Sequence, residues 1–189
     1  SFNLAGQSNP LESWKKPIQT HLSIGNITLN FLEVLRLNKK EIKFFNASTS
    51  EIYGNPKTKI NEYSLIDPKN PYGCSKAFAH NIIKSYREKY NIFCLNGILF
   101  NHESNFRSTK YFLRKLVKEG IEIKKNLRKK IYLESLNHIR DFSYAGDIVD
   151  AMIKIMDLKK PEDFIIASGK SYHLSWILNL FIKKLNLKT

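Results

Sequence analysis

Hydrophobic and polar positions along this chain follow two periods, one typical of strands and one typical of helices. Residues 43–47 form a short apolar run with two phenylalanines, which predicts a buried strand. Residues 71–90 carry apolar side chains at helical spacing, and the segment opens with a proline that suits the first position of a helix. We therefore expect a strand and a helix close together in the sequence.

The same two patterns alternate over the rest of the chain. The predicted strands span residues 2–5, 41–47, 92–100, 131–133 and 164–167. The predicted helices span residues 21–37, 71–90, 109–119, 145–158 and 174–185, and residues 101–108 form a predicted loop. This alternation predicts an α/β fold with a mostly parallel sheet that helices cover on both faces.

Composition and charge narrow the function classes. The 189 residues are 42% hydrophobic, as in a globular domain, and no apolar run is long enough to cross a membrane. The net charge is +14, from 31 Lys and Arg against 17 Asp and Glu, yet the lysines are dispersed without a basic tract. We therefore expect no nucleic-acid partner and no membrane partner. The positive charge equally suits a small molecule that carries phosphates.

The two cysteines, Cys74 and Cys94, have neither metal-binding nor redox spacing. We expect no metal site, and a reducing cytoplasm as the location.

Candidate chemistry gathers where the strand at 43–47 ends. If the backbone stays extended, Thr49 and Glu51 point to the same side, beyond the carboxyl end of the strand where open parallel sheets bind ligands. Tyr72 and Lys76 are four residues apart on one face of the next helix. A neighbouring ammonium favours the phenolate, so the tyrosine can act as a base. Tyr-x-x-x-Lys alone is a weak signal, but a preceding Ser-Thr-x-Glu strand end makes it much more specific.

The sequence lacks the glycine-rich turn that cradles a dinucleotide pyrophosphate. Its eight glycines are at positions 6, 25, 54, 73, 97, 120, 146 and 169, never closer than nineteen residues. The chain also starts without a methionine, inside a predicted strand. We therefore expect a fragment that lacks its first two βα units, roughly sixty to seventy residues.

Several blocks resemble the GDP-mannose 4,6-dehydratase family of extended short-chain dehydrogenases/reductases. The blocks are Asn3-Leu4-Ala5-Gly6-Gln7-Ser8, Ala47-Ser48-Thr49-Ser50-Glu51-Ile52-Tyr53-Gly54, Asn70-Pro71-Tyr72-Gly73-Cys74-Ser75-Lys76, Tyr86-Arg87-Glu88-Lys89-Tyr90, Asn96-Gly97-Ile98-Leu99-Phe100-Asn101-His102-Glu103-Ser104, Arg140-Asp141-Phe142 and Ile166-Ala167-Ser168-Gly169-Lys170. The resemblance implies a partial Rossmann-type, doubly wound parallel sheet without its first βα units, with part of a small C-terminal substrate domain. It implies that residues 1–104 belong to the NADP-binding domain with the catalytic residues. Residues 105–189 then contribute the nucleotide-sugar-binding domain and the last sheet elements.

The resemblance also implies an activity, the conversion of GDP-mannose to its 4-keto-6-deoxy product by internal hydride transfer through NADP. Tyr72, assisted by Lys76, would take the proton of the C4 hydroxyl. Thr49 would hold the C4 oxygen. Glu51 would remove the C5 proton and return it to the departing C6 hydroxyl.

By the same resemblance, further residues would bind the cofactor or the substrate. The implied cofactor contacts are Leu4, Ala5, Gly6, Gln7, Ser8, Tyr72, Lys76, His102 and Arg107. The implied substrate contacts are Asn101, Lys115 and Arg140. The full-length protein would form a homo-oligomer, a dimer or a tetramer.

Blander interpretations stay open for these positions. Glu51 suits a solvated loop, His102 a satisfied loop histidine, and Arg107 and Lys115 a charged surface, while Asn101 and Arg140 suit the anchoring of a loop. After its Asn-His-Glu-Ser block the family continues Pro-Arg-Arg-Gly, whereas this chain has Asn105-Phe106-Arg107-Ser108. Two other functions also stay open. One is a related nucleotide-sugar epimerase or reductase, which needs no base for C5; the other is a non-catalytic fragment that cannot hold the cofactor.

Overall fold

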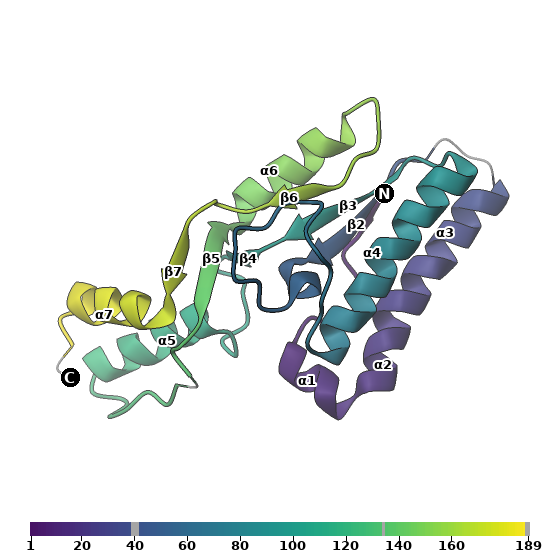
Figure 1. The fold of residues 1–189 in the computed structure, drawn as a ribbon. Helices are drawn as coiled ribbons and strands as arrows, with labels where there is room; N and C mark the ends of the chain where they lie inside the picture. Colours follow the sequence, from purple (N-terminus) through teal and green to yellow (C-terminus); the bar gives the residue numbers. More distant parts are fainter. Residues whose placement is uncertain (39–41, 134, 188–189) are drawn as a thin grey trace. The chain divides into compact units, whose positions relative to one another are not determined.

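The computed structural model describes residues 1–38, 42–133 and 135–187. The chain divides into two compact units, and Figure 1 gives the order of helices and strands along it. Unit 1 comprises Ser1–Phe100 and Val149–Ile166, and unit 2 comprises Asn101–Ile148 and Ala167–Thr189. The division of function at residues 104 and 105 stays a prediction.

Unit 1 contains a parallel sheet, in agreement with the predicted α/β class. Its strands are β1 (Phe2–Asn3), β2 (Phe44–Thr49), β3 (Cys94–Leu99) and β6 (Phe164–Ile166), paired in the order β1-β2-β3-β6. All six residues of β2 are buried, which explains why it reads as an apolar run rather than as an alternating one. The predicted strands overlap these four but are longer, and Glu41 lies outside the described residues.

The first part of unit 1 also contains α-helices. They are α1 (Pro10–Lys15), α2 (Pro17–His21), α3 (Ile27–Asn38) and α4 (Pro71–Tyr90), with a π-helical turn η1 (Leu22–Asn26) between α2 and α3. The single helix predicted at 21–37 is therefore wrong in its first part, because η1 interrupts the regular hydrogen bonding. Helix α4 packs against β2 and β3, and α1, α2 and α3 pack against α4 (Figure 1).

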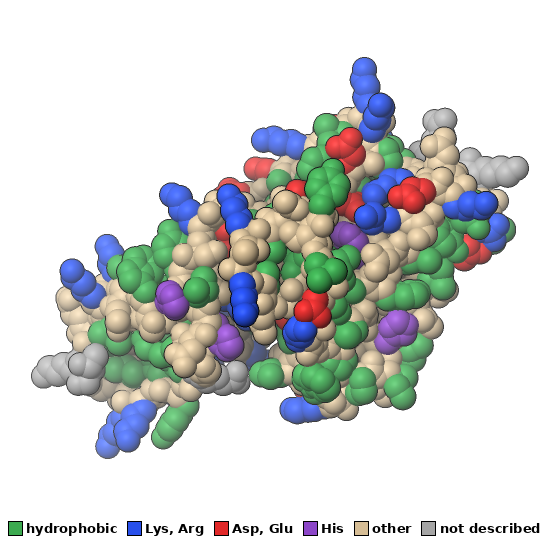
Figure 2. All heavy atoms as spheres, viewed as in Figure 1, with side chains coloured by type: hydrophobic (Ala, Val, Ile, Leu, Met, Phe, Trp, Pro, Cys, Tyr) green, Lys and Arg blue, Asp and Glu red, His purple; other side chains and the backbone are tan. Residues whose placement is uncertain are grey.

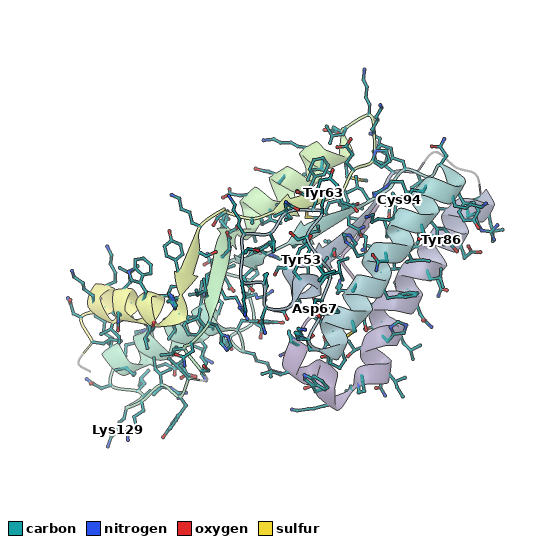
Figure 3. All side chains as sticks on the ribbon, in the orientation of Figure 1. Tyr53, Tyr63, Asp67, Tyr86, Cys94 and Lys129 are labelled. Carbon is teal, nitrogen blue, oxygen red and sulfur yellow. The ribbon has the colours of Figure 1, made fainter. Side chains whose placement is uncertain are left out.

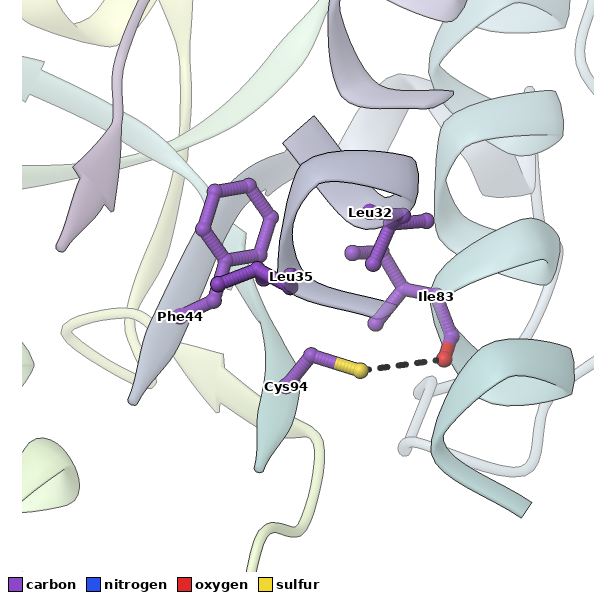
Figure 4. Close-up of a cluster of buried hydrophobic side chains, with 5 residues drawn as sticks. All are labelled: Leu32, Leu35, Phe44, Ile83 and Cys94. Carbon is purple, nitrogen blue, oxygen red and sulfur yellow. Dashed lines mark hydrogen bonds between the residues drawn. The ribbon is translucent and has the colours of Figure 1, made fainter. Parts of the chain in front are cut away.

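The core of unit 1 lies between α3, α4 and the sheet. One cluster of buried side chains consists of Leu32, Leu35, Phe44, Ile83 and Cys94 (Figure 4). The Cys94 thiol donates to the Ile83 carbonyl at 3.4 Å, as the dashed line in Figure 4 marks. Because each element supplies at least one of these side chains, their burial fixes α3 and α4 against the strands.

Unit 2 contains a smaller sheet of three short strands. These are β4 (Asn101–Glu103), β5 (Ile139–Tyr144) and β7 (Ser171–His173), in the order β4-β5-β7, and the helices are α5 (Phe112–Lys124) and α7 (Leu174–Leu185). Strands β4 and β5 are parallel, whereas β5 and β7 are antiparallel. The strand predicted at 131–133 is wrong, because those residues lie outside any strand, and the predicted loop 101–108 opens with β4.

Helix α6 (Ala145–Met156) starts in the residues of unit 2 and ends in those of unit 1. At its end, the Lys43 ammonium donates to the carbonyls of Met156 and Leu158, both at 2.8 Å. A cation at the last carbonyls of a helix is favourable, because these carbonyls carry the negative end of the helix dipole.

The surface carries dispersed charge. On the face in Figure 2, Lys and Arg side chains are scattered among hydrophobic and uncharged groups. Tyr63 is 94% exposed, whereas Tyr53 and Cys94 are buried (Figure 3).

Among the described residues, no helix is both long and apolar enough to span a bilayer. Within the same ranges, His, Cys, Asp and Glu side chains form no group of three or more that could hold a metal ion.

Candidate active site

The carboxyl end of β2 does not stay extended beyond Thr49. Residues Ser50–Tyr53 form a 3-10 turn, and the Thr49 hydroxyl oxygen accepts from the Glu51 amide at 3.3 Å. The prediction that Thr49 and Glu51 point to one side by strand alternation is therefore wrong. Thr49 acts as the cap that starts the turn, as Thr commonly does before a helical segment.

The turn nevertheless carries Glu51 to the start of α4. The Asn70 side chain donates from Nδ2 to Glu51 Oε2 at 2.9 Å, and its Oδ1 accepts from the Gly73 amide at 2.8 Å as the N-cap of α4. Gly73 allows this approach, because a Cβ there would lie 2.8 Å from the Glu51 carbonyl oxygen. A carboxylate at this position is stabilised by the positive end of the helix dipole.

Tyr72 and Lys76 lie on α4, as the spacing predicts. Both are buried, and Lys76 Nζ lies 6.0 Å from the centroid of the Tyr72 ring. Nζ also donates to the Ala47 carbonyl of β2 at 2.7 Å. Burial lowers the pKa of Lys76 to about 8, so the side chain still carries its charge at neutral pH. The four predicted catalytic residues thus lie on β2, on the turn after it and on the first two turns of α4, all in unit 1.

A layer of buried polar side chains lies behind these residues, and sequence reasoning missed it. Ser48 Oγ lies 3.3 Å from His80 Nδ1, and His80 Nε2 lies 3.7 Å from Asp163 Oδ2. His80 follows Lys76 by four residues, so the helical spacing that singles out Tyr72 and Lys76 extends to it. Asn70 was also missed, although an Asn-Pro pair before a helical pattern is a known start signal.

The predicted cofactor segment follows β1. The strand ends at Asn3, so Leu4 and Ala5 are not part of it, which corrects the predicted strand 2–5. Leu4, Ala5, Gly6 and Ser8 are exposed, and Gln7 is half-buried. Gly6 has a φ of +116°, a conformation that suits glycine, and a Cβ there would lie 2.7 Å from the Ser23 carbonyl oxygen. This segment therefore presents exposed residues beyond a strand end.

The other predicted site residues lie in unit 2. Asn101 and His102 are in β4, and Asn101 Nδ2 donates to the Asp141 carbonyl at 3.2 Å. The Arg107 guanidinium carbon lies 3.6 Å from the centroid of the Tyr111 ring. Arg140 is in β5 and is half-buried.

Lys115 is in α5, and its ammonium donates to the Tyr132 carbonyl. An ammonium has three N–H donors, so this bond leaves two of them for a ligand.

Residues 2–189 match the model of the protein family described as GDP-mannose 4,6 dehydratase. The chain belongs to this family. It is 34% identical over 183 residues to GDP-mannose 4,6 dehydratase 1 of Arabidopsis thaliana. The aligned region covers 95% of this chain and 51% of that protein. The chain spans about half the length of the curated relatives that it matches.

Solved structures show the same fold for this member of the GDP-mannose 4,6-dehydratase family. RMD from Pseudomonas aeruginosa, complexed with NADPH, matches with a TM-score of 0.91 and 20% identity, over 99% of this chain and 65% of that one. A UDP-N-acetylglucosamine 4-epimerase from Methanobrevibacter ruminantium matches with a TM-score of 0.85 and 22% identity, over 98% of this chain and 60% of that one. The predicted partial Rossmann-type fold is thereby confirmed.

Proposed function

We propose that this chain carries the catalytic part of a nucleotide-sugar 4,6-dehydratase that converts GDP-mannose to GDP-4-keto-6-deoxymannose. The observation that carries the proposal is the hydrogen bond from Asn70 to Glu51. It brings a carboxylate to the start of the helix that bears Tyr72 and Lys76. A dehydration of this kind needs one more proton acceptor than oxidation of a hydroxyl does, and Glu51 is that group.

The proposed catalytic residues act at C4, C5 and C6 of the hexose. Tyr72 removes the proton of the C4 hydroxyl, and the Lys76 ammonium beside it favours the phenolate that does so. Thr49 holds the C4 oxygen. Once C4 is a ketone, the C5 proton is acidic; Glu51 removes it and protonates the departing C6 hydroxyl, which leaves as water.

A bound NADP would supply the hydride chemistry between C4 and C6. Tyr72 would give the proton it took from the C4 hydroxyl to C5 when C6 receives the hydride. The exposed residues Leu4, Ala5 and Gly6 follow a strand end, where a dinucleotide would meet the sheet. We assign Gln7, Ser8, Tyr72, Lys76, His102 and Arg107 to the same cofactor. The glycine-rich pyrophosphate turn has no counterpart among the glycines of this sequence.

The remaining parts of the proposal concern substrate, assembly and location. Asn101, Lys115 and Arg140 bind the nucleotide sugar, whose phosphates suit the basic side chains. The full-length protein is a homo-oligomer, a dimer or a tetramer. It is cytoplasmic, in keeping with two free cysteines, Cys74 exposed and Cys94 buried.

A product assay tests the activity. The full-length protein is incubated with GDP-mannose and NADP, and the sugar is followed by NMR and mass spectrometry. We expect a product that has lost one water and carries a C4 ketone, with the rate reduced about 10²- to 10⁴-fold in Glu51→Gln. A 4-epimer of the substrate, formed at equal rates by wild type and Glu51→Gln, would contradict the proposal.

A related nucleotide-sugar 4-epimerase is the second candidate. Such an enzyme uses the Tyr72 and Lys76 pair but leaves the C5–H bond intact. Solvent deuterium separates the two reactions, because removal and return of the C5 proton would exchange it and epimerisation would not. We expect deuterium at C5 of recovered substrate or product.

A further inference from the structure

Ser48 lies immediately before Thr49 in β2, and its side chain points to the other face of the strand. Its residue is 3% exposed, and its Oγ lies 3.3 Å from Nδ1 of His80, which is 2% exposed. The pair therefore joins β2 to α4 inside the core. A buried contact between two polar side chains is rigid, because neither has water as an alternative partner.

On its other side, the His80 ring faces the Asp163 carboxylate. Its Nε2 lies 3.7 Å from Asp163 Oδ2. The Asp163 carboxylate accepts from Arg87 at 2.7 and 3.2 Å and from the Asn96 amide at 2.8 Å. Asp163 is thus held in place by groups other than His80.

The charge of His80 follows from its surroundings. Burial lowers the pKa of His80, and the positive charges of Lys84 and Arg87 lower it further, while Asp163 opposes them. Neutral imidazole has one N–H, and a carboxylate only accepts, so the proton belongs on Nε2 facing Asp163. Nδ1 then accepts the hydrogen bond from the Ser48 hydroxyl.

The positions along α4 give this contact its meaning. Tyr72, Lys76 and His80 follow one another at four-residue intervals on one face of the helix. Lys76 binds the Ala47 carbonyl, and His80 binds the next residue, Ser48. Two successive helical turns therefore hold two successive residues of β2, directly before Thr49.

We propose that His80 is a positioning residue, which acts through Ser48 to fix the β2 backbone at Thr49 relative to α4. The proposal rests on the proposed function for its consequence in catalysis. The same Ser, His and Asp types occur in hydrolase triads, but here the serine is buried from substrate, so it does not act as a nucleophile.

Three variants separate positioning from simple packing. Ser48→Ala removes the hydroxyl, His80→Gln keeps a polar atom near the place of Nε2, and His80→Asn keeps one near the place of Nδ1. Ser85→Ala is the control. The Ser85 hydroxyl also makes a hydrogen bond in unit 1, to the Asn81 carbonyl at 3.2 Å, but it lies on the exposed side of α4.

In the product assay, we expect kcat to fall about 10- to 100-fold in Ser48→Ala and His80→Gln, since small displacements of reacting groups have effects of this size. KM for the sugar should stay unchanged, because the loss lies in the orientation of the catalytic groups. His80→Asn should retain most of the wild-type kcat, and Ser85→Ala all of it. Equal losses in His80→Asn and His80→Gln would overturn the proposal.

A second readout needs no turnover. The titration of Lys76, followed by NMR of its Cε and Nζ, reports how closely α4 is held to β2. We expect its pKa to rise from about 8 toward the ordinary 10.5 in Ser48→Ala and His80→Gln, since water reaches the loosened ammonium. It should not move in His80→Asn or Ser85→Ala. An unchanged Lys76 titration in folded Ser48→Ala, the smallest deletion of the set, would refute the positioning role.

The two readouts fail separately. If the wild-type full-length protein yields no ketone product, the proposed function fails, while the Lys76 titration still decides the role of His80. If His80→Gln does not fold, Ser48→Ala decides it alone, because it deletes a single oxygen and leaves the imidazole in place.

Discussion

Lys76 lies buried beside Tyr72, with its Nζ bound to the Ala47 carbonyl at 2.7 Å. A buried ammonium is costly, and this cost appears as a pKa lowered from 10.5 to about 8. Because the folded pKa is below the unfolded one, the folded chain releases this proton first as the pH rises. Between pH 8 and 10.5 the unfolded chain binds more protons, so stability rises with pH in that window.

Replacing the lysine should remove this pH dependence. In Lys76→Met, we expect the free energy of unfolding, relative to wild type, to decrease by roughly 3 kcal/mol as the pH rises from 8 to 10.5. The variant is favoured at neutral pH, where wild type buries a charge, and loses that advantage where wild type is neutral. Urea denaturation of both proteins over this range measures the difference. A difference that does not change with pH would show that Lys76 is hydrated in the folded chain.

At the scale of elements, an asparagine from each of three neighbouring strands lies in register. Asn3 of β1 is opposite Asn46 of β2, which is opposite Asn96 of β3. Asn3 donates to Asn46 at 3.3 Å, Asn46 donates to Asn96 at 2.9 Å, and Asn96 donates to Asp163 at 3.3 Å. This buried row of amides stabilises one register of the sheet, because a slipped strand would leave them without partners.

Truncation of the central amide should therefore be costly. We expect Asn46→Ala to lower the free energy of unfolding by about 1–3 kcal/mol, since it leaves the Asn96 side-chain oxygen without its donor. The Asn3 amide loses one acceptor but still donates to the Thr28 hydroxyl oxygen at 3.3 Å. Asn81→Ala on the exposed side of α4 is the matched control and should change it by less than about 0.5 kcal/mol. Equal effects in chemical denaturation would show that the row adds no more than a surface asparagine does.

The elements that sequence predicted best are those whose ends carry local signals. Helix α4 begins at Pro71 and ends before Asn91, which has a left-handed conformation, and its predicted bounds agree with the structure. Strands β4 and β7 were missed because they have only three residues each, and β5 because its six residues are neither an alternating nor a continuous apolar run. Helix α1 was missed although Asn9 caps it, since its six residues are too few to establish a helical period.

The candidate site was predictable in the same uneven way. Tyr72 and Lys76 were found because one helix carries both. The place of Glu51 depends on a hydrogen bond from Asn70, nineteen residues away, and that of Ser48 on His80, thirty-two residues away. Contacts over such separations leave no period in the sequence.

At the scale of the whole molecule, the chain contains the proposed catalytic residues but no glycine-rich pyrophosphate turn. We expect NADP binding by this chain to be too weak to detect by calorimetry, because backbone amides of such a turn supply much of the affinity for a dinucleotide. GDP-mannose under the same conditions is the comparison. Tight binding of NADP with turnover would show that the segment after β1 holds the cofactor without that turn.

The two cysteines of unit 1 differ sharply in reactivity. Cys74 is exposed on α4, whereas burial raises the pKa of Cys94 to about 12 and leaves it unreactive near neutral pH. A maleimide dye or nitroxide should therefore label Cys74 alone, with one equivalent found by intact mass. Since Cys74 lies between Tyr72 and Lys76, the natural sequence already provides a handle for fluorescence or spin-resonance measurements on α4, without any engineered thiol.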